Sequence, residues 1–350
     1  MSKKTNKAPS FGRKARIEFY RRVKSQMERG LSSVDAVSRI LIAMRKQDME
    51  KNIVYKPMQY IYKNMVSGKH GVSMSAALRP MIGDAEYTLL ASAEKNGQYV
   101  QGFNEVLYML GANGKMKGAV VSALSYPAVI TVVIIGVLHF FKGNLIPVAL
   151  KLAPLEKWPA ISQWMYWMAQ SLLPYMVVFV IFVVLSSIFL SRTMPKWDNL
   201  KARKNFDKYF PPFILYRTIS GAMFLISMSS ILKTGSSAQE ALDFIAKGAS
   251  PYMMAKVRMI QRRMGNGKRI GESLDVGLFD KETNVSIDIF SNDENFDERL
   301  NEISHESVDN TVKTIQVIGQ VIFYISLVSV ATVIGVMLLG FMSLTRTVTG

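Results

Sequence analysis

The sequence contains no cysteine and only three histidines, and this scarcity limits the chemistry open to it. Without thiols the chain can form neither disulfides nor thiolate-ligated zinc or iron–sulfur centres. The histidines, His70, His139 and His305, are far apart, and no group of carboxylates shows metal-ligand spacing. We therefore expect no metal site and no cofactor.

Catalytic motifs are missing as well. The stretch Gly265-Asn266-Gly267-Lys268 resembles a phosphate loop, but Arg262 and Arg269 occupy positions where such a loop needs Gly and then Ser or Thr. There is no Gly-x-Ser-x-Gly elbow and no kinase signature. We predict that the protein has no catalytic residue and is not an enzyme.

Long stretches without charge interrupt this basic chain, which has 350 residues and a formal net charge of +17. Residues 118–141, 158–191 and 314–345 contain no Lys, Arg, Asp or Glu. About 20 apolar residues suffice to cross the hydrocarbon core of a membrane as a helix. We predict three transmembrane helices, at residues 119–140, 171–191 and 317–341.

The distribution of basic residues predicts the orientation. Residues 1–118 contain 21 Lys and Arg and residues 192–316 contain 18, against three in 142–171 and one in 342–350. Basic residues close to a span are retained on the cytoplasmic side. We predict a multi-pass membrane protein with its N-terminus inside the cell and its C-terminus outside. Its cytoplasmic segments would be 1–118 and 192–316, and its outer segments would be the loop 141–170 and the tail 342–350, which in a bacterial inner membrane are periplasmic.

Two further segments bear on this topology. The first hundred residues contain no apolar core followed by a small-residue cleavage site, so we expect no cleaved signal peptide. Residues 213–232 are apolar enough to suggest a fourth crossing, but Arg217 and several serines interrupt them. We predict that this stretch is a buried helix of the second cytoplasmic domain.

The chain is internally repeated. Three segments of the first part recur in the same order in the second part, at offsets of 205, 196 and 197 residues. The pairs are 30–37 with 235–242, 71–78 with 267–274, and 103–106 with 300–303. At these offsets the first predicted crossing falls on the third. Each repeat is therefore predicted to be a soluble domain followed by one crossing, with 171–191 as the connector.

Both soluble domains have the apolar periodicity of helices. Val37, Ile40 and Met44 recur at three- and four-residue steps, which is typical of one buried helix face. Gly30 and Gly235 each end a helical pattern, where a left-handed turn is expected. Strand-like alternation is almost absent. We predict an all-α membrane protein with two homologous helical-bundle domains.

Four tryptophans are candidates for membrane anchors. Trp158, Trp164 and Trp167 precede the second predicted crossing, and Trp197 follows it. Indole rings prefer the headgroup boundary, so these residues are expected to fix the depth of the helix. Ordinary packing is the alternative for one or two of them.

Two charged stretches are candidate docking surfaces, although most such stretches are simply solvated. A basic strip comprises Lys256, Arg258, Arg262, Arg263, Lys268 and Arg269. Residues 280–309 hold ten acids against two basic residues, and we single out Asp293, Glu294, Asp297 and Glu298. The excess positive charge of residues 1–118 is best explained by attraction to anionic lipid headgroups. No nucleic-acid partner is expected.

Several motifs resemble those of the F-domain family, the inner-membrane platform proteins of type IV pilus assembly and type II secretion. Ala123, Leu124, Tyr126 and Pro127 match the Ala-Leu-x-Tyr-Pro that opens the family's first crossing. The stretches from Gly71 to Leu78 and from Gly267 to Leu274 resemble its Gly-x-x-Leu-x-x-Ala-Leu element.

A third family element is only partly kept. Glu94 and Gly97 resemble the end of the family's Gly-Glu-x-x-Gly turn, but Ala93 replaces its first Gly. In the second repeat the turn reads 291–295, Ser-Asn-Asp-Glu-Asn, and is lost. These departures suggest a divergent branch, such as the type IVb pili or conjugative thin pili.

The resemblance implies a function without chemistry of its own. Such a platform, a homo-oligomer in the lipid bilayer, would couple a hexameric cytoplasmic assembly ATPase to the polymerisation of pilin or pseudopilin subunits. It would also contact other inner-membrane assembly proteins. This implication rests on analogy with the family.

Two other functions fit parts of the sequence. A membrane-anchored nucleic-acid-handling component of a conjugation apparatus would bind DNA through residues 1–118 in a salt-dependent way. A small transporter would need more crossings and charged groups at mid-membrane, and the three charge-free windows lack such groups. The platform function agrees best with the topology and the repeats.

Overall fold

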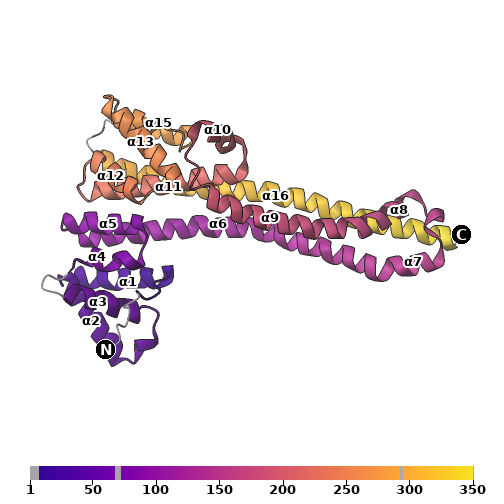
Figure 1. Ribbon diagram of the computed structural model, residues 1–350, viewed down its shortest axis with the longest axis horizontal. Helices are drawn as coiled ribbons and strands as arrows, with labels where there is room; N and C mark the ends of the chain where they lie inside the picture. Colours follow the sequence, from indigo (N-terminus) through magenta and orange to yellow (C-terminus); the bar gives the residue numbers. More distant parts are fainter. Residues whose placement is uncertain (1–7, 68–71, 292, 294, 350) are drawn as a thin grey trace, which may run out of the picture. The chain divides into compact units, whose positions relative to one another are not determined.

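The computed structural model describes residues 8–67, 72–291, 293 and 295–349. Helices account for most of these residues, and no strand occurs among them (Figure 1). The predicted all-α class is therefore confirmed. Of the predicted site residues, Gly71 and Glu294 lie outside the described part of the chain.

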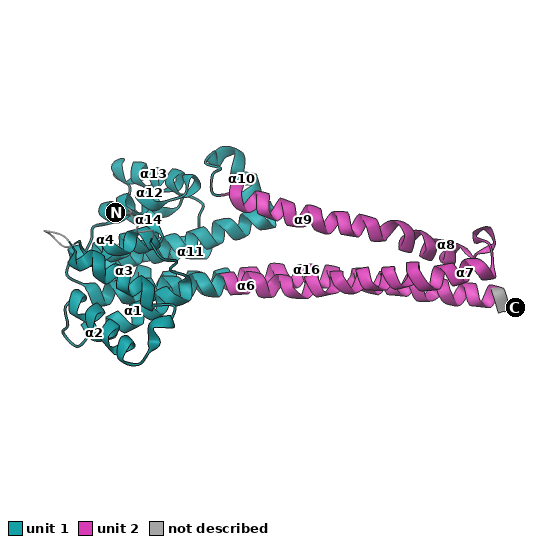
Figure 2. Ribbon diagram, turned by 60° about the horizontal axis from the view of Figure 1, so that its bottom comes forward, with its two compact units in different colours: residues 1–116, 195–311 teal, residues 117–194, 312–350 magenta. Residues whose placement is uncertain are grey.

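The chain forms two compact units (Figure 2). Unit 1 combines residues 1–116 with residues 195–311, so it contains both predicted cytoplasmic domains. Unit 2 combines residues 117–194 with residues 312–350 and contains the three predicted crossings. The two repeats thus contribute to both units.

The helix order of the first repeat recurs in the second. The first series is α1 (Arg13–Met27), α2 (Ser33–Lys46), α3 (Tyr55–Val66), α4 (Met74–Leu78), α5 (Asp84–Lys95) and α6 (Tyr99–Phe140). The second series is α11 (Pro211–Lys233), α12 (Ala238–Gly248), α13 (Pro251–Gly265), α14 (Ile270–Leu274), α15 (Lys281–Phe290) and α16 (Phe296–Thr349). Each helix of the first series has one counterpart in the second.

The helix starts define the correspondence residue by residue. The starts of α2 and α12 differ by 205, those of α3 and α13 by 196, and those of α5 and α15 by 197. The change from 205 to 196 falls between α2 and α3, where the first repeat carries the extra turn η1 (Met49–Lys51). The small indel expected from the sequence falls here, and the second repeat gains one further residue between α14 and α15.

Local signals place the first turn of each repeat. Gly30 and Gly235 have φ values of +85° and +82°, the left-handed conformation predicted for them. Ser32 and Ser237 then accept hydrogen bonds from the backbone N–H groups of Asp35 and Glu240. These caps satisfy N–H groups that a helix start leaves without partners.

Unit 2 has a small core of its own. The predicted loop 141–170 is mostly helical, with a π-helical turn (Phe141–Leu145), α7 (Ile146–Leu152), η4 (Leu155–Lys157) and α8 (Ala160–Trp167). Its apolar residues Ile146, Ala149 and Met165 pack against Leu138 of α6 and Met337 of α16. This apolar packing explains why the segment folds rather than forming an extended loop.

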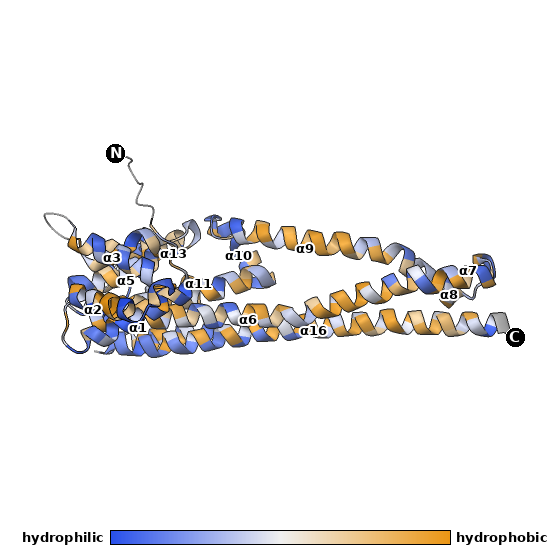
Figure 3. Ribbon diagram, turned by 90° about the horizontal axis from the view of Figure 1, so that it is seen from below, coloured by the Kyte–Doolittle hydropathy of each residue, from blue (hydrophilic) through white to orange (hydrophobic). Residues whose placement is uncertain are grey.

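Four described helices are long and apolar enough to cross a membrane. Three of them are the α6–α7 segment, the helix 160–193 that ends in α9 (Leu173–Thr193), and α16. At most 11% of their most apolar windows is buried, and apolar residues follow one another along them (Figure 3). The fourth, α11, differs because half of its window is buried.

The tryptophans divide into two kinds. Trp164 and Trp167 are about 60% exposed, with ring centroids 6.3 Å apart, as a membrane anchor requires. Trp158 is buried, and its indole N–H donates to the carbonyl of Ala153 at 2.8 Å. Trp197 packs in unit 1 against Phe213, with centroids 5.7 Å apart. Packing therefore accounts for these last two.

Candidate functional site

The two repeats meet in unit 1 along a seam of hydroxyl and amide side chains. Helix α5 of the first repeat packs against α11 and α12 of the second. The hydroxyl of Ser92 lies 2.9 Å from that of Thr234 and 3.0 Å from that of Ser236. Asn96 and Gln101 donate to the carbonyls of Thr234 and Lys233, which end α11. The first repeat thus satisfies the end of a helix in the second.

A buried carboxylate lies further along the same seam. Glu105 of α6 is 8% exposed and accepts a hydrogen bond of 2.6 Å from the hydroxyl of Ser230. The ammonium of Lys233 lies 3.9 Å from the other carboxylate oxygen. A buried charge is tolerated only when it is paired in this way. The seam therefore fixes the two lobes with directional contacts.

Beyond Glu105, α6 and α16 of unit 1 touch each other. The rings of Tyr108 and His305 have centroids 4.0 Å apart. Burial, with the nearby Lys233 ammonium, lowers the pKa of His305, so the imidazole is neutral at neutral pH. Lys115 pairs with Asp309 at 2.6 Å on the exposed side. These contacts join the helices that continue into unit 2.

The retained family turn holds α4 in the first repeat. The Glu94 carboxylate accepts from the backbone N–H groups of Met74 and Ser75, at 3.0 and 3.1 Å, and from the Ser75 hydroxyl. Gly97 has a φ of +72°, which lets the chain turn from α5 into α6. Leu78 at the end of α4 is fully buried. In the first repeat Glu94 and Gly97 therefore hold the start of α4 and the turn between α5 and α6.

The second repeat reaches the same shape differently. Gly267 has a φ of +79°, and Leu274 is fully buried like its counterpart Leu78. No described side chain caps α14. A Cβ on Gly271, the counterpart of Ser75, would lie 2.6 Å from the hydroxyl oxygen of Ser291. The helix starts place Ser291 at the position of Glu94, one residue earlier than the sequence comparison does.

One member of the predicted basic strip cannot be a docking residue. Lys256 is 7% exposed, and its ammonium donates to the carbonyl of Val276 at 2.6 Å. Burial, reinforced by the cations Arg217, Arg203 and Arg263, lowers its pKa to about 8. The prediction of an exposed Lys256 is wrong, because α13 turns this position toward the core of the lobe.

The other strip residues lie at or near the surface. Arg258, Arg262 and Lys268 are exposed and form no ion pair with any described residue. Arg263 instead donates to the carbonyls of Glu272 and Asp275, and Arg269 pairs with the Glu272 carboxylate at 3.1 Å. The cations available to a partner are therefore Arg258, Arg262 and Lys268.

The acidic candidates lie around the start of α16. Asp293 and Glu298 are exposed, and Asp297 is half-buried. The neighbouring Arg299 pairs with Glu302 at 2.9 Å. Asp293, Asp297 and Glu298 therefore lie at the surface of unit 1, where a charged partner could contact them.

A buried arginine missed from the sequence stabilises the segment after α9. Helix α10 (Leu200–Tyr209) packs on α11 through Arg203, which has no exposed surface. Its guanidinium pairs with Asp207 at 2.8 Å and lies 3.8 Å from the ring centroid of Tyr252. Arg203 and Asp207 are four residues apart, which is the spacing of an ion pair on a helix. This spacing is the one feature of the sequence that could have indicated the contact. The contact fixes the chain where it enters the second lobe.

The start of the first predicted crossing packs closely on the third predicted crossing. A Cβ on Gly319 of α16 would lie 2.5 Å from that of Ala123, so the helices cross with their backbones close. The rings of Tyr126 and Phe323 are 5.9 Å apart. Leu124 is about half exposed, and Pro127 lies inside the continuous α6. Within this motif Ala123 has the clearest structural role.

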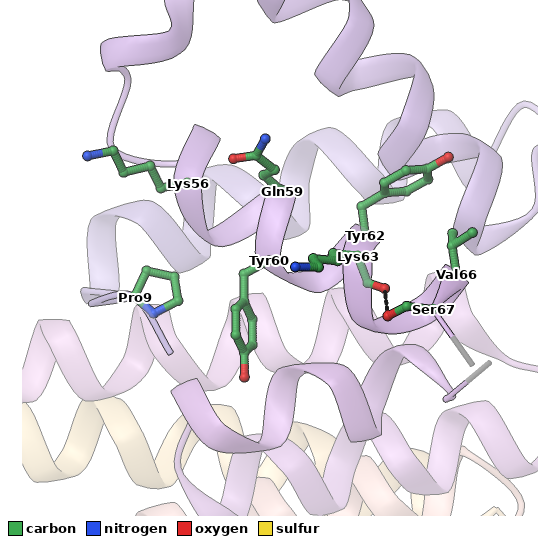
Figure 4. A pocket seen from close by; sticks show the side chains of 8 residues that line it. All are labelled: Pro9, Lys56, Gln59, Tyr60, Tyr62, Lys63, Val66 and Ser67. Atoms are coloured by element: carbon green, nitrogen blue, oxygen red, sulfur yellow. Dashed lines mark hydrogen bonds between the residues drawn. The ribbon is translucent and has the colours of Figure 1, made fainter. Parts of the chain in front are cut away.

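A surface groove runs beside α3 (Figure 4). It encloses about 700 Å³ and is lined by Lys56, Tyr60, Tyr62 and Lys63 of that helix together with Pro9. The groove is open and lacks any converging catalytic group. Among the described residues, no set of three His, Asp or Glu side chains is clustered closely enough to hold a metal ion.

Comparison with known proteins identifies two similarities. Residues 224–344 match the family model described as type II secretion system (T2SS), protein F. This range runs from α11 into α16 and so covers most of the second repeat. The toxin coregulated pilus biosynthesis protein E of Vibrio cholerae serotype O1 (strain ATCC 39315 / El Tor Inaba N16961) is 23% identical over 322 residues. That alignment covers 91% of this chain and 92% of the relative.

Proposed function

Because this chain belongs to the family of inner-membrane platform proteins of type II secretion and type IV pilus machines, we propose that it couples a cytoplasmic assembly ATPase to pilin polymerisation. The platform role follows from the family. The ATPase, the pilin subunits and the absence of a catalytic step in this chain are parts of the proposal. The ATPase would be hexameric, and the hydrolysis would be its own.

The observation that carries the proposal is the continuity of two helices. Helix α6 runs without a break from Tyr99 to Phe140, and α16 runs from Phe296 to Thr349. Each starts in a lobe of unit 1 and continues into a candidate membrane span. In each case the hydrogen-bonded backbone of one helix connects a lobe directly to a candidate span, with no loop between them. This supports transmission of force without chemistry.

We retain the predicted topology as part of the proposal. The cytoplasmic domains would be 1–118 and 192–316, the crossings 119–140, 171–191 and 317–341, and the periplasmic parts 141–170 and 342–350. The position of α11 supports three crossings rather than four. Its counterpart α1 has six basic residues in fifteen, and α11 itself packs among α5, α10 and α12.

Single cysteines test this topology directly, since the chain has none of its own. A cysteine at Ser236 should react with a membrane-impermeant maleimide only after the inner membrane is opened. A cysteine at Asn144 should react in intact spheroplasts. Labelling of Ser236→Cys from outside would refute the topology and place α11 across the membrane.

The exposed charges define two candidate ATPase contacts. The first is the basic set Arg258, Arg262 and Lys268, and the second is the acidic set Asp293, Asp297 and Glu298. Complementary charged surfaces speed association and exclude wrong partners. Helix α9 has no buried residue, so its apolar surface is available to lipid or to a pilin helix.

Co-purification from membranes tests the coupling. The triple variant R258E/R262E/K268E should recover less ATPase than the control K201E/K204E/K208E, which makes the same charge change on the exposed face of α10. Deletion of the gene should leave pilin synthesised but unassembled. Normal fibres in the deletion strain would refute the proposed function, and equal ATPase recovery by both variants would exclude the basic set as the contact.

A pilus machine is favoured over a secretion machine by the second comparison. The relative that covers nearly the whole chain is named for the biosynthesis of a pilus. The altered turn at 291–295 also fits the divergent type IVb or conjugative branch. Surface pili lost on deletion, with secretion of folded proteins unchanged, is the expected phenotype.

A further inference from the structure

One helix face that is buried in the first repeat is exposed in the second. Thr88 and Ser92 of α5 are buried, and both face α11 and α12 across the seam. At the offset of 197 their counterparts on α15 are Val285 and Ile289. These two side chains are 58% and 62% exposed. The apolar residues are thus in solvent while the hydroxyl residues are covered, the reverse of what solvation favours.

The rest of α15 behaves as its counterpart does. Thr283 and Ile287 are buried toward α14, as Glu86 and Leu90 are buried toward their own lobe in α5. The exposed pair therefore belongs to the second side of an otherwise normally packed helix. Among the described residues no packing of α15 against α1 or α2 corresponds to that of α5 against α11 and α12.

The first repeat contains a helix pair, α1 and α2, that could cover the exposed face of α15. Helices α1 and α2 are the counterparts of α11 and α12, and they border an open groove of about 410 Å³. In the second repeat the corresponding space is closed by Ala85 and Thr88 of α5, which leaves about 210 Å³. Ile40 and Ala43 of the open groove correspond at 205 to Ile245 and Gly248 of the closed one.

The charges of the two free faces are complementary. The α1–α2 groove carries Arg21 and Arg39, both exposed and without an ion pair to any described residue. On α15, Glu282 lies three residues before Val285 on the same face and also pairs with no described residue. The counterpart of Glu282 is Ala85, and the counterpart of Arg39 is Phe244. In the closed seam Ala85 and Phe244 line the same pocket. The two charges would therefore lie close together.

We propose that α15 of one copy of this chain docks in the α1–α2 groove of a second copy. The contact repeats between copies the packing that α5 makes on α11 and α12 within one chain. Each copy offers one groove and one helix, so the interface is head-to-tail and leads to a ring or an ordered array. The inference goes beyond the proposed function, because it needs neither an ATPase nor a pilin.

The seam supplies the positions for a crosslinking test. Ser92 and Ser236, whose hydroxyls are 3.0 Å apart, correspond to Ile289 and Leu31. Two full-length copies with different tags, one carrying Ile289→Cys and the other Leu31→Cys, are produced together in membranes and mildly oxidised. The expected product is a heterodimer that carries both tags. The native chain has no cysteine, so every disulfide joins two introduced residues, and the product with both tags is distinguished from dimers that carry one tag.

The control pairs Ile289→Cys with Lys51→Cys, an exposed position outside the groove. Crosslinking of the control pair to the same extent, or no heterodimer with Leu31→Cys, overturns the proposal. A disulfide formed only within one chain, when both cysteines are placed in a single copy, also overturns it.

Charge reversal provides the second readout. R39E and E282R should each lower the heterodimer yield, by about tenfold if the two charges are in close contact, and the two together should restore it. Loss without restoration means that the residues act separately and contradicts the assigned pairing. The assay needs no other pilus component, so a negative result leaves the proposed coupling role standing, and failure of that role leaves the crosslink standing.

Discussion

The substitution Lys256→Met should change how the stability of the protein depends on pH. Lys256 is buried, and its pKa is lowered from 10.5 to about 8. Below pH 8 the lysine is charged in both the folded and the unfolded chain. Between about pH 8 and 10.5 the folded chain loses this proton while the unfolded chain keeps it. The unfolded state then binds more protons, so the free energy of unfolding rises with pH.

The size of the effect follows from the pKa difference. A fall from 10.5 to about 8 corresponds to about 3 kcal/mol, which the wild type regains as the pH rises to 10.5. At pH 7 the variant escapes this burial cost but loses the hydrogen bond to the Val276 carbonyl, worth about 1.5–3 kcal/mol. These two effects nearly cancel. The slope with pH, rather than the stability at pH 7, is therefore the diagnostic quantity.

The assay is chemical unfolding of the full-length protein in detergent at a series of pH values. The difference between wild type and K256M should grow by up to about 3 kcal/mol from pH 8 to 10.5. Lys268→Met, at an exposed position of the same strip, is the matched control and should follow the wild type. Parallel curves for wild type and K256M would refute the assignment of a buried, charged lysine.

Three further substitutions have expected outcomes. Gly319→Leu should destabilise unit 2 by about 1–3 kcal/mol, because the backbones of α16 and α6 are close at Ala123. The control Gly335→Leu should be nearly neutral, because a Cβ there meets nothing within 4 Å. Equal melting temperatures for the two variants would contradict the close crossing. Glu105→Ala should cost about 3 kcal/mol, because it leaves a hydroxyl and an ammonium without their buried acceptor, and Glu105→Gln should cost less; limited proteolysis at the seam should follow the same order. Glu94→Ala should lower the free energy of unfolding by about 1–3 kcal/mol, since it removes the acceptor for the first N–H groups of α4; an unchanged denaturation midpoint would show that solvent replaces the carboxylate.

Much of the architecture could be predicted from the sequence because it depends on local or periodic signals. Charge-free windows reveal candidate spans, and Gly30 and Gly235 mark left-handed turns that few other residues adopt. The repeat could be detected because the segments around these turn glycines recur in the same order at similar offsets. The helical nature of 141–170 was not predicted, since its short apolar segments are stabilised by packing against α6 and α16 rather than by their own pattern.

The candidate site was less predictable. A run of charged residues does not show which side chains a helix turns inward, and so Lys256 was grouped with Arg258 and Arg262 although only the last two are exposed. The seam between the two repeats could not be predicted either, because sequence patterns do not show which distant side chains meet. Ser92 and Thr234 are ordinary polar residues, and their importance comes from meeting across 142 positions of sequence.

The loss of the family turn in the second repeat can be explained by the seam. In the first repeat Glu94 ties α5 to the start of α4, and α5 is the helix that carries the contact between the lobes. In the second repeat the described residues give α15 no such contact, so a looser junction at Ser291 costs little.

Ser291→Glu should therefore restore the missing cap. The Ser291 side chain already lies beside Gly271 at the uncapped start of α14, and a carboxylate there can accept from its N–H groups. We expect a gain of about 1 kcal/mol in the free energy of unfolding, within the range measured for helix caps. Ser291→Gln is the neutral control and should gain less, because the helix start favours negative charge. If S291E is no more stable than S291Q, the position does not act as the counterpart of Glu94.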